Sequence, residues 1–252
     1  MINHGLIARD YKIDPVGVDA PEFSGDVIPR KHWPDLIADQ RKNFNSPYAV
    51  HTENNIPILD QTSFRYCWMF AIVAGVMNRA AFQGLNDPVD ELSATAVASQ
   101  GKNFRNVGGH CSEAVRYCQK FGIPQADVWP NDQSSRRYAR KKQVRESAAK
   151  QNIVQFADLG QNFDAAISCL LSQTPVPVSF SLPWWKHAVL GLQVNFLPRR
   201  NPLQIESYEL VFVNSYGASY EQGGFGKLRG ANMIGQEYIA IENVQVGNDD
   251  DR

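Results

Sequence analysis

The stretch from residue 60 to residue 77 changes character at a single position. Residues 60–66 are mostly polar and show no helical period, whereas residues 68–77 are apolar throughout apart from one glycine. A run this apolar predicts a helix that is buried on all sides, and Gly84 predicts its end after Gln83. The rest of the chain must therefore pack around this helix, and Cys67 stands where the loop becomes the helix.

The position of Cys67 has a chemical consequence. The free N–H groups at the start of a helix favour negative charge, so a thiol there is expected to ionise readily. The thiolate is the nucleophilic form of cysteine, which makes this a suitable place for covalent catalysis. The alternative is a buried cysteine that acts as a small apolar side chain, which is the commoner role of an isolated cysteine.

Composition limits the classes of partner and compartment. The chain has 252 residues, 43% of them hydrophobic and 20% charged, which is typical of a soluble protein with one large domain or two lobes. A net charge of −1 favours neither nucleic acid nor a membrane surface as the main partner. Four cysteines are too few for a disulfide scaffold, and residues 1–20 lack the apolar core of a signal peptide. We expect a cytoplasmic protein, or part of a particle assembled in the cytosol.

Hydrophobic periodicity changes along the chain from helical to strand-like. Residues 61–150 predict helices, and residues 151–245 predict strands with one helix at 162–173. This order indicates an α+β fold with a helical lobe, a β lobe and a site in the cleft between them. The helices are expected at 67–83, 92–98 and 112–121, and the strands at 153–156, 176–181, 188–196, 205–214, 224–228 and 237–242.

The two ends of the chain differ from its body. Repeated X-Pro steps predict an extended arm over residues 1–57, with a helix only at 34–43. Val27, Ile28 and Trp33 are expected to anchor the arm along the β lobe, outside the active-site cleft, and residues 1–60 also offer a surface for an assembly partner. Residues 246–252 predict a charged tail.

Residues 136–150 carry seven lysines and arginines. A basic run can bind nucleic acid, but it is more often the solvated face of a surface helix. Because the whole chain is slightly acidic, we favour the solvated face and expect no specific nucleic-acid partner.

Three further residues have the chemistry that a nucleophilic cysteine needs. His187 begins an apolar strand and is the candidate base; Asn214 ends another strand and has an amide oxygen that can fix the imidazole tautomer. Gln61 lies six residues before Cys67 and can donate to the same oxygen as the Cys67 backbone N–H. Each also has an ordinary interpretation, as a strand-end histidine, a turn asparagine or a solvated loop glutamine.

The sequence motifs around these residues, in the order in which they occur along the chain, resemble those of the papain-like cysteine peptidases. Asn214 follows Cys67 by 147 residues, which is within the spacing of that family. The resemblance covers about residues 58–245 and is closest to a divergent bacterial or phage type. The matching motifs are Gln61 with Cys67-Trp68, Gly108-Gly109, His187-Ala188-Val189, Asn214-Ser215-Tyr216-Gly217 and Gly224-Phe225.

The resemblance implies a two-lobe fold with a helical lobe, a β-barrel-like lobe and peptide-bond hydrolysis in the cleft between them. Cys67 would be the nucleophile and would pair with His187 as thiolate and imidazolium, with Asn214 orienting the imidazole and Gln61 completing the oxyanion hole. The substrate would be a peptide or protein, with no metal and no cofactor. The implied substrate-binding residues are Gly108, Gly109, His110, Cys111, Trp68, Lys186 and Tyr216.

Several residues depart from the family pattern. Residues 64–66 lack the cysteine of the family's loop disulfide, and Tyr216 replaces the tryptophan that would shield the His–Asn hydrogen bond. Lys186 places a cation beside His187, which disfavours the imidazolium, and His110 predicts a weaker preference for large apolar substrate side chains. These departures leave an alternative open, a weakly active or inactive papain-fold subunit of a larger assembly such as a phage particle.

Overall fold

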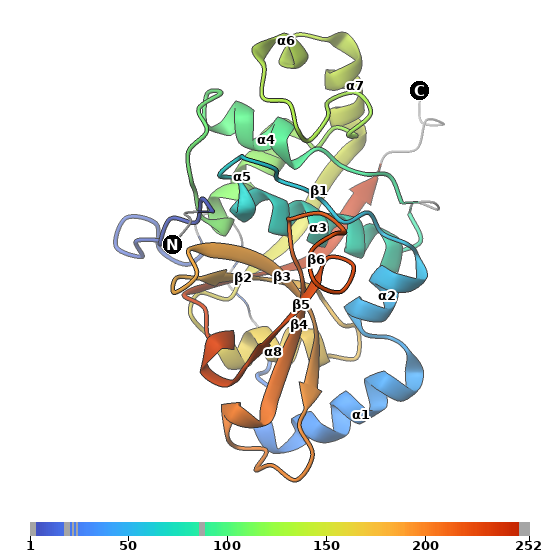
Figure 1. Cartoon of the computed structure of the whole chain (residues 1–252), viewed down its shortest axis with the longest axis vertical. Helices are drawn as coiled ribbons and strands as arrows, with labels where there is room; N and C mark the ends of the chain where they lie inside the picture. Colours follow the sequence, from blue (N-terminus) through green and yellow to red (C-terminus); the bar gives the residue numbers. More distant parts are fainter. Residues whose placement is uncertain (1–3, 18–20, 22, 24, 86–88, 247–252) are drawn as a thin grey trace.

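The computed structural model describes residues 4–246 except 18–20, 22, 24 and 86–88, and it has the α+β architecture that the sequence predicts (Figure 1). The predicted tail falls almost wholly on residues 247–252, outside the described residues. The helices are α1 (Trp33–Asn43), α2 (Pro47–Glu53), α3 (Cys67–Phe82), α4 (Ala94–Gly101), α5 (Cys111–Phe121), α6 (Arg136–Ala139), α7 (Lys142–Lys150) and α8 (Phe163–Leu171), with short 3₁₀ turns at Arg30–His32, Ile205–Ser207 and Gly230–Met233.

Six strands form one antiparallel sheet in the order β1-β6-β2-β3-β4-β5. β1 and β6 extend beyond the predicted strands because all of β1 pairs with the part of β6 from Ile239 to Val246. The strands are β1 (Gln151–Asp158), β2 (Val178–Leu182), β3 (His187–Phe196), β4 (Tyr208–Val213), β5 (Phe225–Arg229) and β6 (Glu237–Val246).

Helix α3 is the centre of the molecule. Every one of its residues from Cys67 to Ala81 is buried, as expected for a helix that is apolar on all faces. It packs between the helices α2, α4 and α5 and the strands β3 and β6. Gly75 allows the closest approach, because a Cβ there would lie 2.6 Å from the Ile241 side chain. Strand β3, which begins with His187, is thus packed directly on the helix that begins at Cys67.

Two caps fix the helices near the site. Ser93 accepts a hydrogen bond from the Ala96 N–H at the start of α4, as its sequence position predicts. His110 caps α5 by accepting from the Glu113 N–H, so this helix starts at Cys111, one residue before the predicted start. Residues 108–111 therefore lead into the buried N-terminus of α5.

The later part of the arm packs on the β strands and α8. Trp33 is fully buried, its ring lies edge-on to Phe163 and Tyr208, and its Nε1 donates to the Ile28 carbonyl at 2.8 Å. Val27 is exposed and does not serve as an anchor. Helix α2, which the sequence analysis missed, starts with a proline at its first position and a side-chain cap from Ser46.

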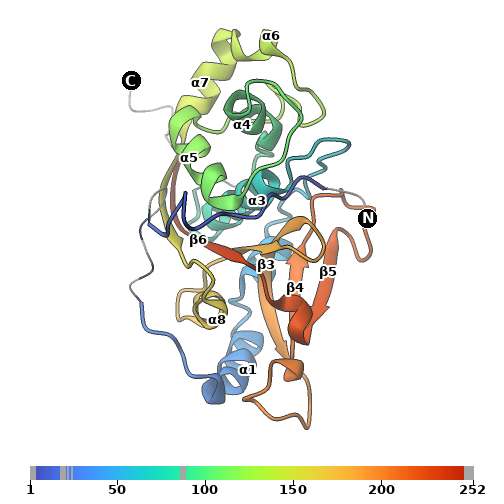
Figure 2. The same cartoon turned by 90° about the vertical axis from the view of Figure 1, so that its left-hand side faces the viewer.

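The first described residues take a different path from the one predicted. In Figure 2 the chain near the N-terminus crosses between α5 and the sheet. Leu6 forms a parallel β-bridge with Gly109, in which the Ile7 N–H donates to the Gly109 carbonyl at 2.9 Å and the Gly109 N–H donates to the Gly5 carbonyl at 3.0 Å. The prediction that the arm stays clear of the site is therefore wrong for residues 4–9, which we call the N-terminal segment.

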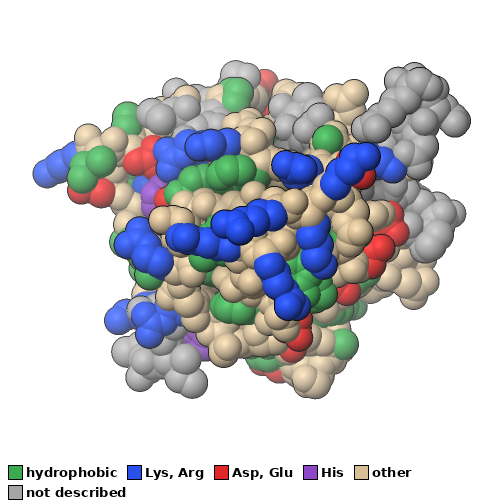
Figure 3. Space-filling view, turned by 90° about the horizontal axis from the view of Figure 1, so that it is seen from above, with side chains coloured by type: hydrophobic (Ala, Val, Ile, Leu, Met, Phe, Trp, Pro, Cys, Tyr) green, Lys and Arg blue, Asp and Glu red, His purple; other side chains and the backbone are tan. Residues whose placement is uncertain are grey.

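The basic run forms α6 and α7 on the outer surface of the helical part. Figure 3 shows its lysine and arginine side chains spread over this face. α7 buries only one side, through Val144, Ser147 and Ala148, and Lys142 pairs with Glu146 on the exposed side at 3.2 Å. This is the pattern of a solvated surface helix.

Candidate active site

Cys67 occupies the first turn of α3 and has no exposed surface. The backbone amides of Ala188, Trp68 and Leu6 lie against its sulfur. Ala188 belongs to β3 and Leu6 to the N-terminal segment, so the sulfur lies between the helical part, the sheet and the start of the chain.

His187, at the start of β3, and Asn214, directly after β4, meet at the same end of these two neighbouring strands. The His187 Nε2 is 2.7 Å from the Asn214 Oδ1, and both side chains are buried. The Asn214 Oδ1 also accepts from the Ser215 N–H at 2.8 Å, which fixes the amide with its oxygen toward the ring. An amide oxygen only accepts, so Nε2 carries the proton and Nδ1 of the neutral ring is left as an acceptor.

Three aromatic rings surround the imidazole. Tyr216 stacks on His187 with centroids 4.9 Å apart and 20° between the planes, and its hydroxyl lies 3.5 Å from Nδ1. Trp185 meets the imidazole edge-on at 4.7 Å, and the His4 ring does so at 4.9 Å. Sequence reasoning missed Trp185 and His4. The only sequence signal for Trp185 was its position two residues before His187.

Gln61 is buried and held at both ends of its amide. Its Nε2 donates to the Phe64 carbonyl at 2.6 Å and to the His4 carbonyl at 3.3 Å. Its Oε1 accepts from the Ser215 hydroxyl at 2.6 Å, which orients the nitrogen toward the N-terminal segment. Ser215 was not among the predicted site residues, although it directly follows Asn214.

The Gly108-Gly109 loop lies against the N-terminal segment. A Cβ on Gly108 would be 2.2 Å from the Gly5 carbonyl oxygen, and one on Gly109 would be 2.7 Å from the Trp68 ring. Only glycine allows a second strand to come this close. Trp68 is fully buried behind Gly109, where its Nε1 donates to the Arg65 carbonyl, so it supports the loop from inside.

The remaining predicted substrate-binding residues fall into two places. His110 and Cys111 begin α5, and the Cys111 N–H donates to the buried Glu237 carboxylate at 2.9 Å. Lys186 is exposed, at a positive φ of 51° in the turn before β3.

Burial reverses the predicted ionisation of the pair. It raises the pKa of the Cys67 thiol to about 12, against smaller opposing effects from the surrounding backbone amides. It also lowers the pKa of His187 to about 3; the Asn214 hydrogen bond opposes this shift, and the charge of a protonated His4 adds to it. Both shifts run against the expected thiolate–imidazolium pair, because burial favours the uncharged thiol and the uncharged imidazole.

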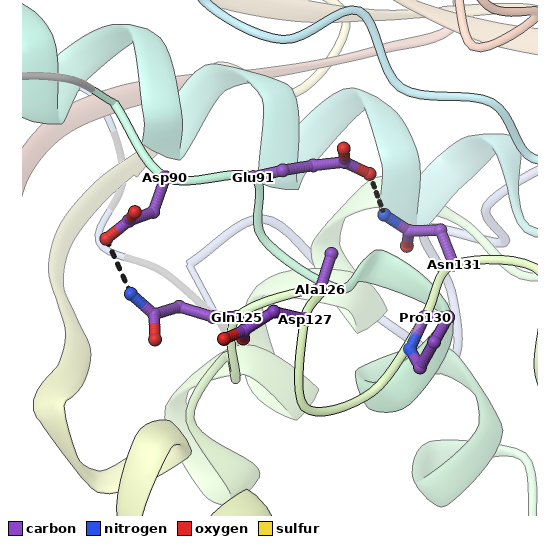
Figure 4. A pocket seen from close by; sticks show the side chains of 7 residues that line it. All are labelled: Asp90, Glu91, Gln125, Ala126, Asp127, Pro130 and Asn131. Atoms are coloured by element: carbon purple, nitrogen blue, oxygen red, sulfur yellow. Dashed lines mark hydrogen bonds between the residues drawn. The ribbon is translucent and has the colours of Figure 1, made fainter.

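Within the described residues, no three His, Cys, Asp or Glu side chains are grouped so as to hold a metal ion, and no helix is long and apolar enough to cross a membrane. All four cysteines are free and buried. A cavity of about 470 Å³ lies between residues 90–91 and 125–131 (Figure 4), where Asp90 bonds Gln125 and Glu91 bonds Asn131, and it shares no residue with the candidate site.

Comparisons with known proteins identify the fold. No protein-family model matches the chain, and no curated protein matches it. Among solved structures, digestive procathepsin L 3 of Tenebrio molitor larval midgut matches with a TM-score of 0.56 and 16% identity, over 73% of this chain and 65% of that chain. Xylellain, a cysteine protease from Xylella fastidiosa, matches with a TM-score of 0.56 and 14% identity, over 75% and 83%.

A third solved structure shows the same likeness. The cysteine protease and lectin-like domains of Cwp84, a surface layer associated protein of Clostridium difficile, match with a TM-score of 0.59 and 13% identity. This match covers 79% of our chain and 52% of that one, so the chain spans about half to two thirds of two of these three proteins. The fold is that of the papain-like cysteine proteases, in a divergent form.

Proposed function

We propose that the chain is a cysteine peptidase in which Cys67 is the nucleophile and His187 is the base. Asn214 orients His187, and Gln61 joins the Cys67 N–H as oxyanion donor. One observation carries the proposal: a peptide of the chain itself lies on these groups, with the His4 carbonyl 3.3 Å from Gln61 Nε2 and the Leu6 amide against the Cys67 sulfur. The shared fold with three cysteine proteases supports it.

The reaction begins when the N-terminal segment leaves and water reaches the pair. The Cys67 proton passes to Nδ1 of His187, the nitrogen that the Asn214 contact leaves free to accept. The thiolate attacks the substrate carbonyl carbon, and the oxygen becomes an oxyanion held by Gln61 and the Cys67 N–H. The C–N bond breaks, and the amine leaves with the proton from His187. Water then adds to the thioester, giving its proton to His187, and the carboxylic acid product departs from the regenerated thiol.

The same geometry makes the closed chain latent. The sulfur faces the Leu6 N–H and not a carbonyl carbon that it could attack. The β-bridge between Leu6 and Gly109 holds this arrangement in place. A peptide substrate needs the positions that Gly5 and Leu6 occupy, so it competes with them. Hydrolysis therefore requires the segment to move. A cytosolic location and a partner for residues 1–60 stay predictions from the sequence.

The second candidate is a non-catalytic papain-fold subunit of a larger assembly such as a phage particle. It is favoured by one observation, the complete burial of the Cys67 and His187 side chains. In that case the N-terminal segment is a permanent part of the core, and it does not open for substrate.

Hydrolysis of an unstructured protein substrate by the purified full chain separates the two candidates. We expect turnover in the wild type or in Gly5→Ala, a variant that displaces the N-terminal segment. Cys67→Ser in either background should lower turnover at least about 10³-fold. The matched control is Cys118→Ser, because Cys118 is an equally buried cysteine whose sulfur packs on Met69 away from the site. Turnover that survives Cys67→Ser contradicts the proposal, and its absence in every protein supports the second candidate.

A further inference from the structure

The positive charge of the chain is concentrated in its helical part. Residues 92–150 carry eleven lysines and arginines against four acidic residues, a net charge of +7, whereas the rest of the chain has a net charge of −8. Figure 3 shows the face on which α6 and α7 lie, where lysine and arginine side chains outnumber the acidic ones. The net charge of −1 therefore conceals an uneven distribution, and this part of the molecule attracts anions.

Five basic side chains of α6, α7 and the turn between them have no carboxylate to neutralise them. They are exposed and have no ion-pair partner among the described residues, unlike Lys142, which pairs with Glu146 at 3.2 Å. Oppositely charged residues four apart on a helix neutralise each other, so cations without such partners leave a local positive potential. We call these five residues the basic face: Arg136, Arg137, Arg140, Lys141 and Arg145.

An aromatic stack holds part of the basic face in place. Trp129 is buried and stacks with Phe104 at 6.4 Å and with Tyr138 at 5.5 Å between ring centroids. The Arg136 guanidinium lies over the Phe104 ring at 5.5 Å. The Lys141 ammonium lies over the Tyr138 ring at 4.3 Å. Because these cations are already positioned, they lose less conformational freedom when an anion binds.

The surroundings of the basic face favour an acidic protein segment over other polyanions. Single-stranded nucleic acid needs free aromatic faces for its bases, but here Trp129 is buried and the other two rings carry cations. Binding in a membrane surface needs apolar side chains that enter it, and among the described residues from 92 to 150 only Val107 is a large apolar residue that is exposed. Carboxylates need neither feature, because they bind guanidinium groups directly.

The loop before Gly109 joins the basic face to the candidate site. Arg136 donates to the Asn103 side chain at 3.0 Å, at one end of this loop. Near the other end, the Asn106 side chain bonds the backbone of the loop before Cys67, and Gly109 pairs with the N-terminal segment. The six residues from Asn103 to Gly109 span at most about 20 Å. A substrate held beside Gly109 therefore reaches the basic face with about six further residues.

We propose that the basic face docks an acidic segment of the protein substrate, about six or more residues away from the bond that is cleaved. This rests on the proposed peptidase function and names the class of substrate on which it acts. Arginine suits the role because its planar guanidinium binds a carboxylate through two parallel hydrogen bonds. Docking raises the local concentration of the cleavable bond at Cys67, so it lowers KM and changes kcat little.

Peptide binding tests the docking surface without catalysis. A labelled peptide of five Glu-Ser repeats is titrated with the full chain at 50 mM salt, and its fluorescence anisotropy gives Kd. Arg137→Glu/Arg140→Glu should raise Kd at least about 10-fold, 300 mM salt should also raise it, and the neutral Gln-Ser peptide should not bind. Arg199→Glu/Arg200→Glu is the matched control, because it makes the same change of charge at two exposed arginines of the β lobe and should leave Kd unchanged.

Steady-state cleavage tests the role in substrate choice. An unstructured substrate carries the Glu-Ser or the Gln-Ser repeats at one end or the other, about eight residues from the cleaved bond, and is assayed with Gly5→Ala. At one end the acidic repeats should raise kcat/KM about 10-fold through KM. Adding Arg137→Glu/Arg140→Glu should remove this gain and leave the rate with Gln-Ser repeats unchanged, whereas Arg199→Glu/Arg200→Glu should keep the gain.

The outcomes separate this inference from the proposed function. Peptide binding that is lost in Arg137→Glu/Arg140→Glu, without turnover in any protein, keeps the docking surface and overturns the peptidase. Turnover that differs less than about twofold between acidic and neutral repeats at both ends overturns the docking role and leaves the peptidase standing. Equal binding by the two double variants, or no binding by the wild type, overturns the docking surface. A 20-base-pair DNA duplex that binds the basic face more tightly than the acidic peptide at 150 mM salt overturns its assignment to a protein segment.

Discussion

Gly5→Ala is the sharpest perturbation of the closed state. Gly5 has φ of 108°, a conformation that other residues rarely adopt, and a Cβ there would lie 2.1 Å from the Arg65 backbone oxygen. That contact is to backbone, which cannot turn aside as a flexible side chain would. The substitution therefore penalises the closed position of the N-terminal segment and leaves the rest of the core untouched.

The magnitude follows from two costs. A non-glycine residue in a sparsely populated backbone region costs about 1–3 kcal/mol, and the overlap with Arg65 adds to it. A total of about 3 kcal/mol raises the open-to-closed ratio roughly 100-fold, since about 1.4 kcal/mol is a factor of ten. The rate at which reagents reach Cys67 should rise by the same factor, up to the limit set by a fully exposed thiol.

The assay is the second-order rate of alkylation of Cys67 by iodoacetamide, followed by peptide mass spectrometry. Gly223→Ala is the matched control, because Gly223 also has a positive φ, of 67°, but a Cβ there has no atom within 4 Å. It should alkylate at the wild-type rate. Cys118 and Cys169 serve as internal references for general unfolding, since both are buried in the core.

Two results would refute this reasoning. Equal Cys67 alkylation in Gly5→Ala and wild type would mean that the N-terminal segment does not control access. A parallel rise at Cys118 and Cys169 would mean that the substitution unfolds the protein as a whole and does not open the site selectively.

Three further predictions concern other parts of the structure. Ser215→Ala removes the hydroxyl that orients Gln61, so kcat should fall about 10-fold with little change in KM in steady-state assays; an unchanged kcat would show that Ser215 does not position the oxyanion donor. Burial lowers the pKa of His51 to about 4, so below pH 6.5 the unfolded chain binds a proton that the folded chain does not. The free energy of unfolding from urea titrations should therefore fall as pH drops from 6.5 to 4, by up to about 1.4 kcal/mol per pH unit, and His51→Phe should flatten this slope; equal slopes would argue against it. Trp33→Ala should cost about 3–5 kcal/mol in the same titrations by removing a buried ring, and a loss below about 1 kcal/mol would show that the arm is not an anchor.

The sequence predicted those parts of the site that depend on local pattern. Cys67 begins α3 because a polar loop meets an apolar run there, and a run of this length without proline favours a buried helix. His187 and Asn214 were each placed at a strand end. Their contact at 2.7 Å followed from the resemblance, since no local pattern shows that β3 and β4 are neighbours.

The N-terminal segment could not be predicted in the same way. Its place between Gly109 and His187 depends on a backbone bridge and on a positive φ at Gly5, and neither has a sequence signature. The segment itself contains no proline, and the X-Pro steps that predict an extended arm begin only at Pro15. A pairing of this kind is a tertiary contact, so the local preferences of single residues do not predict it.

The ionisation of Cys67 was misjudged for the same reason. The helix start lowers a thiol pKa when water can reach the site, and the prediction assumed an open site. With the N-terminal segment in place, loss of water is the larger effect and raises the pKa to about 12. The proposed peptidase function assigns the two tendencies to a closed and an open state of the molecule.

The most direct measurement is the detection of the acyl-enzyme. Full-length Gly5→Ala is mixed with a peptide ester, quenched in acid within the first turnovers and digested for mass spectrometry. We expect a thioester that adds the mass of the acyl group to the peptide containing Cys67, and we expect this adduct to be lost in Gly5→Ala/Cys67→Ser. Product formation with no adduct at Cys67, or with the adduct on another residue, would contradict it.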